Sequence, residues 1–180
     1  MREFLTFPTQ PVATEADSPL LPTNSYHWAL LSGPKNVSKA GFQHVMYHVK
    51  DKIVVRNEQS EASRVWEYAA ESDRTSMLLV RIMVAKVSDT RRLESILRKV
   101  PLHADRTEWN SVAWVREALH LAGNEPGTLH PRVKDWEAIR DMAMWYVEQK
   151  KAEHRFDGLG HFDASKPATW DMIQGKEITF

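Results

Sequence analysis

The chain has 180 residues, with 24 basic and 24 acidic side chains, so its formal net charge at neutral pH is zero. Apolar residues make up 42% of the sequence and charged residues 27%, which is typical of one globular domain and excludes a disordered chain. Nucleic-acid-binding proteins usually carry a basic excess or a basic stripe, and this sequence has neither. The expected partners are small molecules, peptides or other proteins, and not nucleic acids.

The absence of cysteine excludes disulfide bonds and thiolate metal sites. The first ten residues lack the basic and then apolar run of a signal peptide. No apolar stretch approaches the roughly 20 residues that span a membrane. We therefore expect a cytoplasmic protein without a membrane span.

Residues 1–24 contain four of the nine prolines, which break any secondary-structure period. This segment is predicted to be an extended, Pro-rich arm without a core of its own. Residues 25–156 are predicted to form a single α+β domain. Residues 157–180 are predicted to be an irregular C-terminal tail, in which the part from Trp170 onwards could add a short strand.

Four segments of the domain have the composition of strands. They are residues 26–31, 42–49, 64–69 and 77–87. The first ends at the turn signal Ser32-Gly33-Pro34. The last is almost continuously apolar and rich in Val, Ile and Leu, which predicts a central strand covered on both faces.

After Val87 the apolar period changes to that of helices. Asp89 is predicted to cap a first helix that ends before Pro101. A second helix is predicted from about Asn110 to Leu121, and a third from Pro131 to about Lys151. Strands followed by helices predict an α+β fold, with a mainly antiparallel sheet of four to five strands against two or three helices.

The nucleophile candidate is Ser111, at the start of the second predicted helix. At 100° per residue, the apolar side chains of this helix fall near the direction of Ser111, and its charged side chains fall on the far side. A helix N-terminus offers unpaired N–H groups and a positive partial charge, which stabilise negative charge on a nucleophile. The alternative is that Ser111 or Asn110 serves only as the helix N-cap.

Two histidines on predicted strands, His27 and His48, are candidates for a general base and the group that orients it. The alternative for each is a strand histidine that is half exposed or hydrogen-bonded in the core. A metal site is not expected, because His44 and His48 would lie about 13 Å apart along one strand. No Gly-rich loop precedes a helix, so we expect no cofactor.

Three motifs, taken in chain order, resemble one known family. They are Tyr26-His27-Trp28-Ala29-Leu30-Leu31-Ser32-Gly33, Val45-Met46-Tyr47-His48-Val49 and Asn110-Ser111-Val112-Ala113-Trp114-Val115. Their order resembles the lecithin–retinol acyltransferase-like proteins, the circularly permuted branch of the NlpC-type, papain-like hydrolases. Over most of residues 26–156 the chain is also similar to a group of uncharacterised fungal proteins with Y-H-W-A-L and N-C-V-x-W-V motifs.

The resemblance implies a permuted papain-like arrangement and a hydrolase or acyltransferase that acts on an acyl or peptidyl substrate. It implies that Ser111 holds the nucleophile position, that His27 is the base, and that His48 orients the base or polarises the substrate. The motif residues expected to contact the substrate are Trp28, Asn110 and Trp114.

The cysteine of the family pattern is Ser111 here, and an alcohol is a poorer nucleophile than a thiolate. A serine enzyme, a non-catalytic binder and a deliberate Cys-to-Ser replacement are all compatible with this difference. Two further functions stay open. One is a protein-interaction module that docks through residues 1–24. The other is a pocket that binds or cyclises a small apolar metabolite and is lined by Trp28, Trp66, Trp109 and Trp114.

Overall fold

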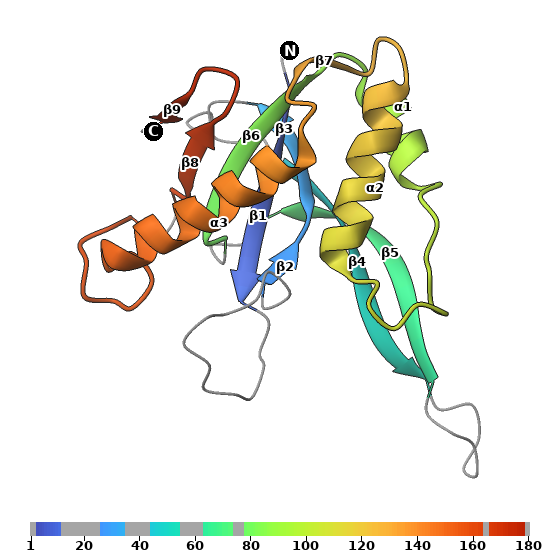
Figure 1. The fold of residues 1–180 in the computed structure, drawn as a ribbon, viewed down its shortest axis with the longest axis horizontal. Coiled ribbons are helices and arrows are strands. Elements are labelled where there is room, and N and C mark those ends of the chain that lie inside the picture. Colours follow the sequence, from blue (N-terminus) through green and yellow to red (C-terminus); the bar gives the residue numbers. More distant parts are fainter. Residues whose placement is uncertain are drawn as a thin grey trace.

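The computed structural model describes residues 3–11, 26–34, 44–54, 63–73, 78–163 and 166–178. These ranges contain nine strands and three helices, arranged as one mainly antiparallel sheet with helices packed on it (Figure 1). The predicted α+β class is confirmed. The sheet is larger than the predicted four to five strands, because strands at both ends of the chain were not recognised in the sequence.

The bounds of the elements follow the chain. The strands are β1 (Glu3–Pro11), β2 (Tyr26–Trp28), β3 (Leu30–Pro34), β4 (His44–Val54), β5 (Ser63–Asp73), β6 (Val80–Val87), β7 (Leu129–Arg132), β8 (Ala168–Asp171) and β9 (Lys176–Ile178). The helices are α1 (Thr90–Leu97), α2 (Ser111–Asn124) and α3 (Trp136–Ala152).

The main path of the sheet has the strand order β5-β4-β3-β1-β6-β8-β9, while β2 pairs with β1 and β7 pairs with β6. Only β6 and β8 are parallel neighbours. All four predicted strand segments are present in the sheet, although 26–31 is divided at Ala29 into β2 and β3. Residues 42, 43 and 77 of the predicted segments lie outside the described residues.

The N-terminal segment corrects the prediction of an arm without a core. Glu3–Pro11 forms β1, which lies between β3 and β6 in the middle of the sheet. It pairs with β3 through residues 3–6 and with β2 through residues 9–11. Pro8 falls where β1 passes from one of these partners to the other, so its missing N–H does not interrupt either ladder. The remainder of the predicted arm lies outside the described residues.

The prediction of a central strand near residues 77–87 is confirmed by β6. Its residues 80 to 85 are all buried, and it pairs with β1, β7 and β8. Arg81 is buried within this apolar run, where its Nε donates a hydrogen bond to Oγ1 of Thr169 on β8 at 3.0 Å. A long apolar run therefore did indicate a strand with neighbours on both edges and cover on both faces.

The three helices begin at the residues that the sequence signals indicate. Asp89, Asn110 and Asp135 are the N-caps of α1, α2 and α3, and each accepts hydrogen bonds from backbone N–H groups of the first turn. Helices α2 and α3 lie against one face of the sheet (Figure 1). The main core forms between them and the sheet, around fully buried Trp28 and Trp114.

The C-terminal segment is less irregular than predicted. Its strands β8 and β9 extend the sheet beyond β6, and β8 contributes buried Ala168, Thr169 and Asp171. Buried Lys150 of α3 donates hydrogen bonds to Glu177 of β9, which ties this edge of the sheet to the helix. The predicted irregular tail is therefore wrong for residues 168–171 and 176–178.

Candidate active site

Ser111 is the first residue of α2, and it does not cap the helix. The cap is Asn110, whose Oδ1 accepts hydrogen bonds from the N–H groups of Val112 at 3.0 Å and Ala113 at 3.1 Å. The alternative in which Ser111 is only the N-cap is therefore excluded. Ser111 is buried, at 7% exposure, at the positive end of a helix of 14 residues.

The hydroxyl of Ser111 makes its hydrogen bond to a strand that lies 83 residues earlier in the chain. The backbone N–H of Trp28 donates to Oγ of Ser111 at 3.1 Å. This N–H belongs to the peptide bond between His27 and Trp28, so the hydroxyl lies directly beside the backbone of His27. Because strand N–H groups point along the plane of a sheet, Oγ lies at the edge of β2 rather than over either face. An N–H donor and a helix N-terminus both stabilise negative charge on this oxygen.

His27 and His48 form a pair that bridges β2 and β4. Nε2 of His27 lies 2.9 Å from Nδ1 of His48, and the rings meet edge to face at a centroid distance of 5.2 Å. When His27 donates from Nε2, its Nδ1 keeps a lone pair and can accept a proton. His48 can in turn be oriented by Glu71 of β5, whose Oε2 lies 3.7 Å from Nε2 of His48.

Both histidines are held in the neutral form that a general base requires. Burial lowers the pKa of His27. Burial, and then the neighbouring His27 ring, lower the pKa of His48 to about 4. Glu71 accepts a hydrogen bond from Nζ of Lys50, which lowers the pKa of this carboxyl and keeps it ionised beside His48. At neutral pH the cluster therefore consists of two imidazoles next to a carboxylate–ammonium pair.

The structure brings the three predicted catalytic residues into one region but does not complete a catalytic pair. Among the described residues, the hydroxyl of Ser111 is bonded to the N–H of Trp28 and the ring of His27 is bonded to His48. Strand alternation directs the side chain of His27 to the face opposite Trp28. A hydrogen bond between Ser111 and His27 thus needs a rotation of one of the two side chains.

The three predicted substrate-contacting residues have other roles in this structure. Trp28 and Trp114 are completely buried, and they pack against Trp136 and Tyr68 at centroid distances of 5.8 and 6.0 Å. Both tryptophans are therefore core residues, because neither exposes surface to a ligand. The carbonyl oxygen of Asn110 is engaged in capping α2. These residues were assigned to the substrate because they lie within the motifs, although what they support is the position of Ser111.

Two charged residues of the cluster, Lys50 and Glu71, were missed in the sequence. Strand alternation is the signal that could have found Lys50, which follows His48 by two positions and so lies on the same face of β4. Glu71 needs the pairing of β4 with β5, in which it lies opposite Met46. That register cannot be read from the sequence of either strand alone.

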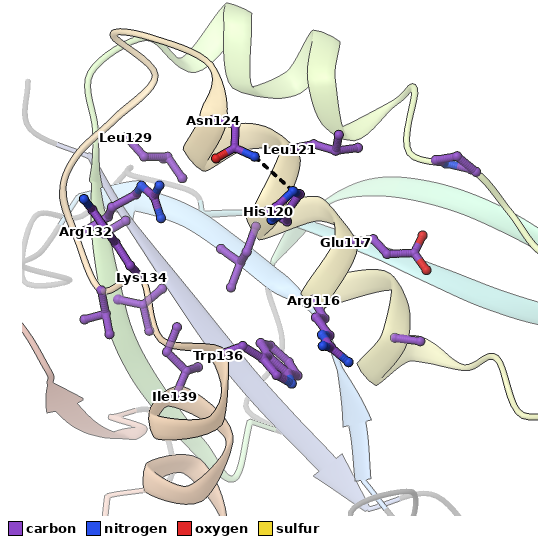
Figure 2. A pocket seen from close by; sticks show the side chains of 16 residues that line it. Arg116, Glu117, His120, Leu121, Asn124, Leu129, Arg132, Lys134, Trp136 and Ile139 are labelled. Carbon is purple, nitrogen blue, oxygen red and sulfur yellow. Dashed lines mark hydrogen bonds between the residues drawn. The ribbon is translucent and has the colours of Figure 1, made fainter.

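The sequence also gave no sign of a pocket between α2, β7 and α3. This pocket has a volume of about 760 Å³ and contains none of Ser111, His27 and His48 (Figure 2). One of its walls is β7, which was not predicted because it has only four residues and includes a proline. Its charged lining residues Arg116, Arg132 and Lys134 belong to no motif.

The fold and the site define an α+β protein with a buried serine at a helix N-terminus and a neutral histidine pair on the adjacent strands. The chain belongs to a family of unknown function, DUF6914, which matches residues 11–179. Searches of the curated proteins and of the solved structures each return no match. In the described part of the chain, none of the helices combines the length and the apolar character needed to cross a membrane.

Proposed function

We propose that this chain is a hydrolase-like or acyltransferase-like enzyme with Ser111 at the nucleophile position. In this proposal His27 is the general base and His48 orients it, with Glu71 behind His48. The permuted papain-like arrangement is part of the same proposal. It is supported by the chain order, in which the two histidine strands precede the helix that carries the nucleophile.

The observation that carries the proposal is the hydrogen bond from the N–H of Trp28 to Oγ of Ser111 at 3.1 Å. It joins the start of α2 to the residue that follows His27, and His27 is itself bonded to His48 at 2.9 Å. A serine that served only to fill space or to cap a helix needs neither this partner nor a neutral imidazole pair nearby. The arrangement supplies a nucleophile, a base and an orienting group within three adjacent elements.

The proposed reaction needs no group beyond the substrate and water or a second acceptor. Oγ of Ser111 attacks the acyl carbonyl carbon while its proton passes to Nδ1 of His27. The tetrahedral intermediate then expels the leaving group, which takes the proton from His27, and an acyl ester remains on Ser111. Water or an acceptor alcohol or amine attacks this ester, loses its proton to His27 and releases the acyl product and the Ser111 hydroxyl.

The second candidate is a non-catalytic or cyclising protein that binds a small molecule. The observation that favours it is the pocket of about 760 Å³, which is remote from the motifs and within the usual size of ligand sites. Nearly complete burial of Ser111 also favours this candidate, because a nucleophile must be reached by its substrate.

Hydrolysis of p-nitrophenyl acyl esters by the wild type, Ser111→Ala and His27→Gln separates these candidates. The proposal predicts turnover that falls to background in Ser111→Ala and by about 10²- to 10⁴-fold in His27→Gln. It also predicts an acyl adduct on the peptide that contains Ser111, detectable by mass spectrometry. Equal rates in the wild type and Ser111→Ala would refute the enzyme and leave the binding protein. Far-UV circular dichroism of each variant serves as the folding control.

A further inference from the structure

We propose that the pocket between α2, β7 and α3 binds a small amphipathic anion, with a carboxylate or similar acid on an aromatic or alicyclic body. This site is separate from Ser111, and its occupancy does not depend on acyl transfer. Figure 2 shows it with α2 on one side and the segment from β7 to the start of α3 on the other.

The floor of the pocket is apolar and belongs to the core of the protein. Val84 of β6, Leu129 of β7 and Ile139 of α3 line it and are 1%, 7% and 2% exposed. Trp136 contributes a half-buried ring at the entrance to α3. This surface suits the body of a ring compound, since a ligand gains most of its affinity from apolar contact with a preformed wall.

The rim of the pocket carries three cations from two walls. Arg116 projects from α2, and Arg132 and Lys134 come from β7 and the residues after it (Figure 2). Among the described residues these three side chains form no ion pair, whereas most other cations of the helices do. Three unpaired positive charges around one apolar hollow favour a ligand with a negative head group.

The acidic residue of the rim does not neutralise these cations. Glu117 is directed to the other side of α2 (Figure 2), where it accepts a hydrogen bond from Nε1 of Trp109 at 3.2 Å and lies 3.4 Å from Nε2 of His103. His120 accepts a hydrogen bond at Nε2 from the side-chain amide of Asn124 at 2.9 Å. Its Nδ1 therefore carries the proton and is a further donor at the rim.

Gly123 leaves the space in which the guanidinium of Arg132 lies. A Cβ at this position would come within 2.7 Å of Cζ and 2.8 Å of one terminal nitrogen of Arg132. Gly123 is a helical residue within α2, where alanine would be the better helix former. The glycine thus sacrifices helix propensity while it holds a cation against the pocket wall, and Gly123→Ala would displace that cation without removing its charge.

The test is calorimetric titration with naphthalene-2-carboxylate and with its uncharged counterpart, 2-naphthalenemethanol. We expect the carboxylate to bind and the alcohol to bind at least about tenfold more weakly, because only the carboxylate gains charge-assisted hydrogen bonds. Arg132→Gln should weaken the carboxylate about tenfold and leave the alcohol unchanged. Lys176→Gln, which removes one positive charge from β9 outside the pocket, should bind both probes as the wild type does.

Gly123→Ala provides a variant in which weaker binding cannot be attributed to lost stability. It should bind the carboxylate less tightly than the wild type, while its unfolding temperature stays the same or rises. Ser111→Ala should bind as the wild type does, which keeps this test separate from ester hydrolysis. Equal affinity for the two probes, no heat with the carboxylate at millimolar concentration, or equal effects of Arg132→Gln and Lys176→Gln would each overturn the proposal.

Discussion

Nε2 of His27 lies 2.9 Å from Nδ1 of His48, which joins two strands whose histidines are 21 residues apart in the sequence. The contact has two consequences. It fixes the orientation of the His27 ring, and it brings two rings so close that neither favours a positive charge. The predictions below test this pair, the sheet around it and the serine beside it.

The histidine pair should make the protein sensitive to mild acid. The pKa of His48 is about 4 in the folded chain and about 6.5 in the unfolded chain. Between these values the unfolded chain takes up a proton that the folded chain refuses, so the free energy of unfolding falls as the pH falls from 6.5 towards 4. From pH 7 to pH 5 this single group should lower it by about 2 kcal/mol.

Urea unfolding of the wild type and His48→Gln at pH 7 and pH 5 measures this effect. The wild type should lose about 2 kcal/mol more than His48→Gln over this interval. His161→Gln, which replaces an exposed histidine, should follow the wild type. If the wild type and His48→Gln lose equal stability, His48 is not held neutral by the fold.

The central position of β1 predicts that a proline within it unfolds the sheet. Phe4 pairs with Gly33 of β3 and with Lys86 of β6, so Phe4→Pro removes a ladder hydrogen bond in the middle of the sheet. We expect a loss of about 3 kcal/mol or more in the free energy of unfolding. Phe4→Leu keeps the N–H and is the control, and its loss should be clearly smaller in chemical denaturation. Equal losses in the two variants would place β1 outside the ladder.

Lys150 should contribute more to stability than its neighbour Lys151. Lys150 is 6% exposed, and its Nζ donates to Oε2 of Glu153 at 2.9 Å and to Oε2 of Glu177 at 3.0 Å. Lys150→Met would leave these two carboxylates side by side, at an expected cost of about 1–2 kcal/mol after allowance for their partial exposure. Exposed Lys151→Met should change stability by less than about 0.5 kcal/mol.

Hydrogen exchange gives the second readout for this pair. Because Glu177 belongs to β9, Lys150→Met should speed amide exchange in β8 and β9 more than in β6. Uniform acceleration across the sheet would show that Lys150 does not hold the C-terminal strands in particular.

Local sequence signals predicted the helices and the inner strands because each of these elements carries its own pattern. Asp89 and Asn110 are N-caps as expected, and the apolar run that ends at Val87 is a strand with two neighbours. These features depend on residues next to one another in the chain. They can therefore be read without knowledge of the rest of the fold.

Features that depend on pairing between distant segments were not predicted. Nothing in Glu3–Pro11 alone indicates that β3 and β6 lie on its two sides, and its prolines favoured an arm. The same holds for β8, whose partner β6 lies more than 80 residues earlier. For the site, the motifs did indicate that Ser111, His27 and His48 belong together. The core positions of Trp28 and Trp114 followed only from the packing of α2 on the sheet.

The central claim is that Ser111 occupies a nucleophile position, and Ser111→Cys tests it directly. The substitution nearly preserves size, so the fold should tolerate it. A thiol at this position would lie at a helix N-terminus, beside the N–H of Trp28 and the residue after His27. These surroundings should lower its pKa from about 8.5 into the range of about 3.5–7.5 that is found for activated cysteines. The chain has no other cysteine, so the signal has a single source.

The measurement is the rate of alkylation by iodoacetamide, a small reagent, as a function of pH in Ser111→Cys and in Ser111→Cys with His27→Ala. The account predicts fast alkylation near pH 6 in the single variant and a marked slowing when His27 is removed. Guanidinium-unfolded protein supplies the rate of an ordinary thiol. A folded thiol that titrates like the unfolded one, with the same rate whether or not His27 is present, would contradict the account.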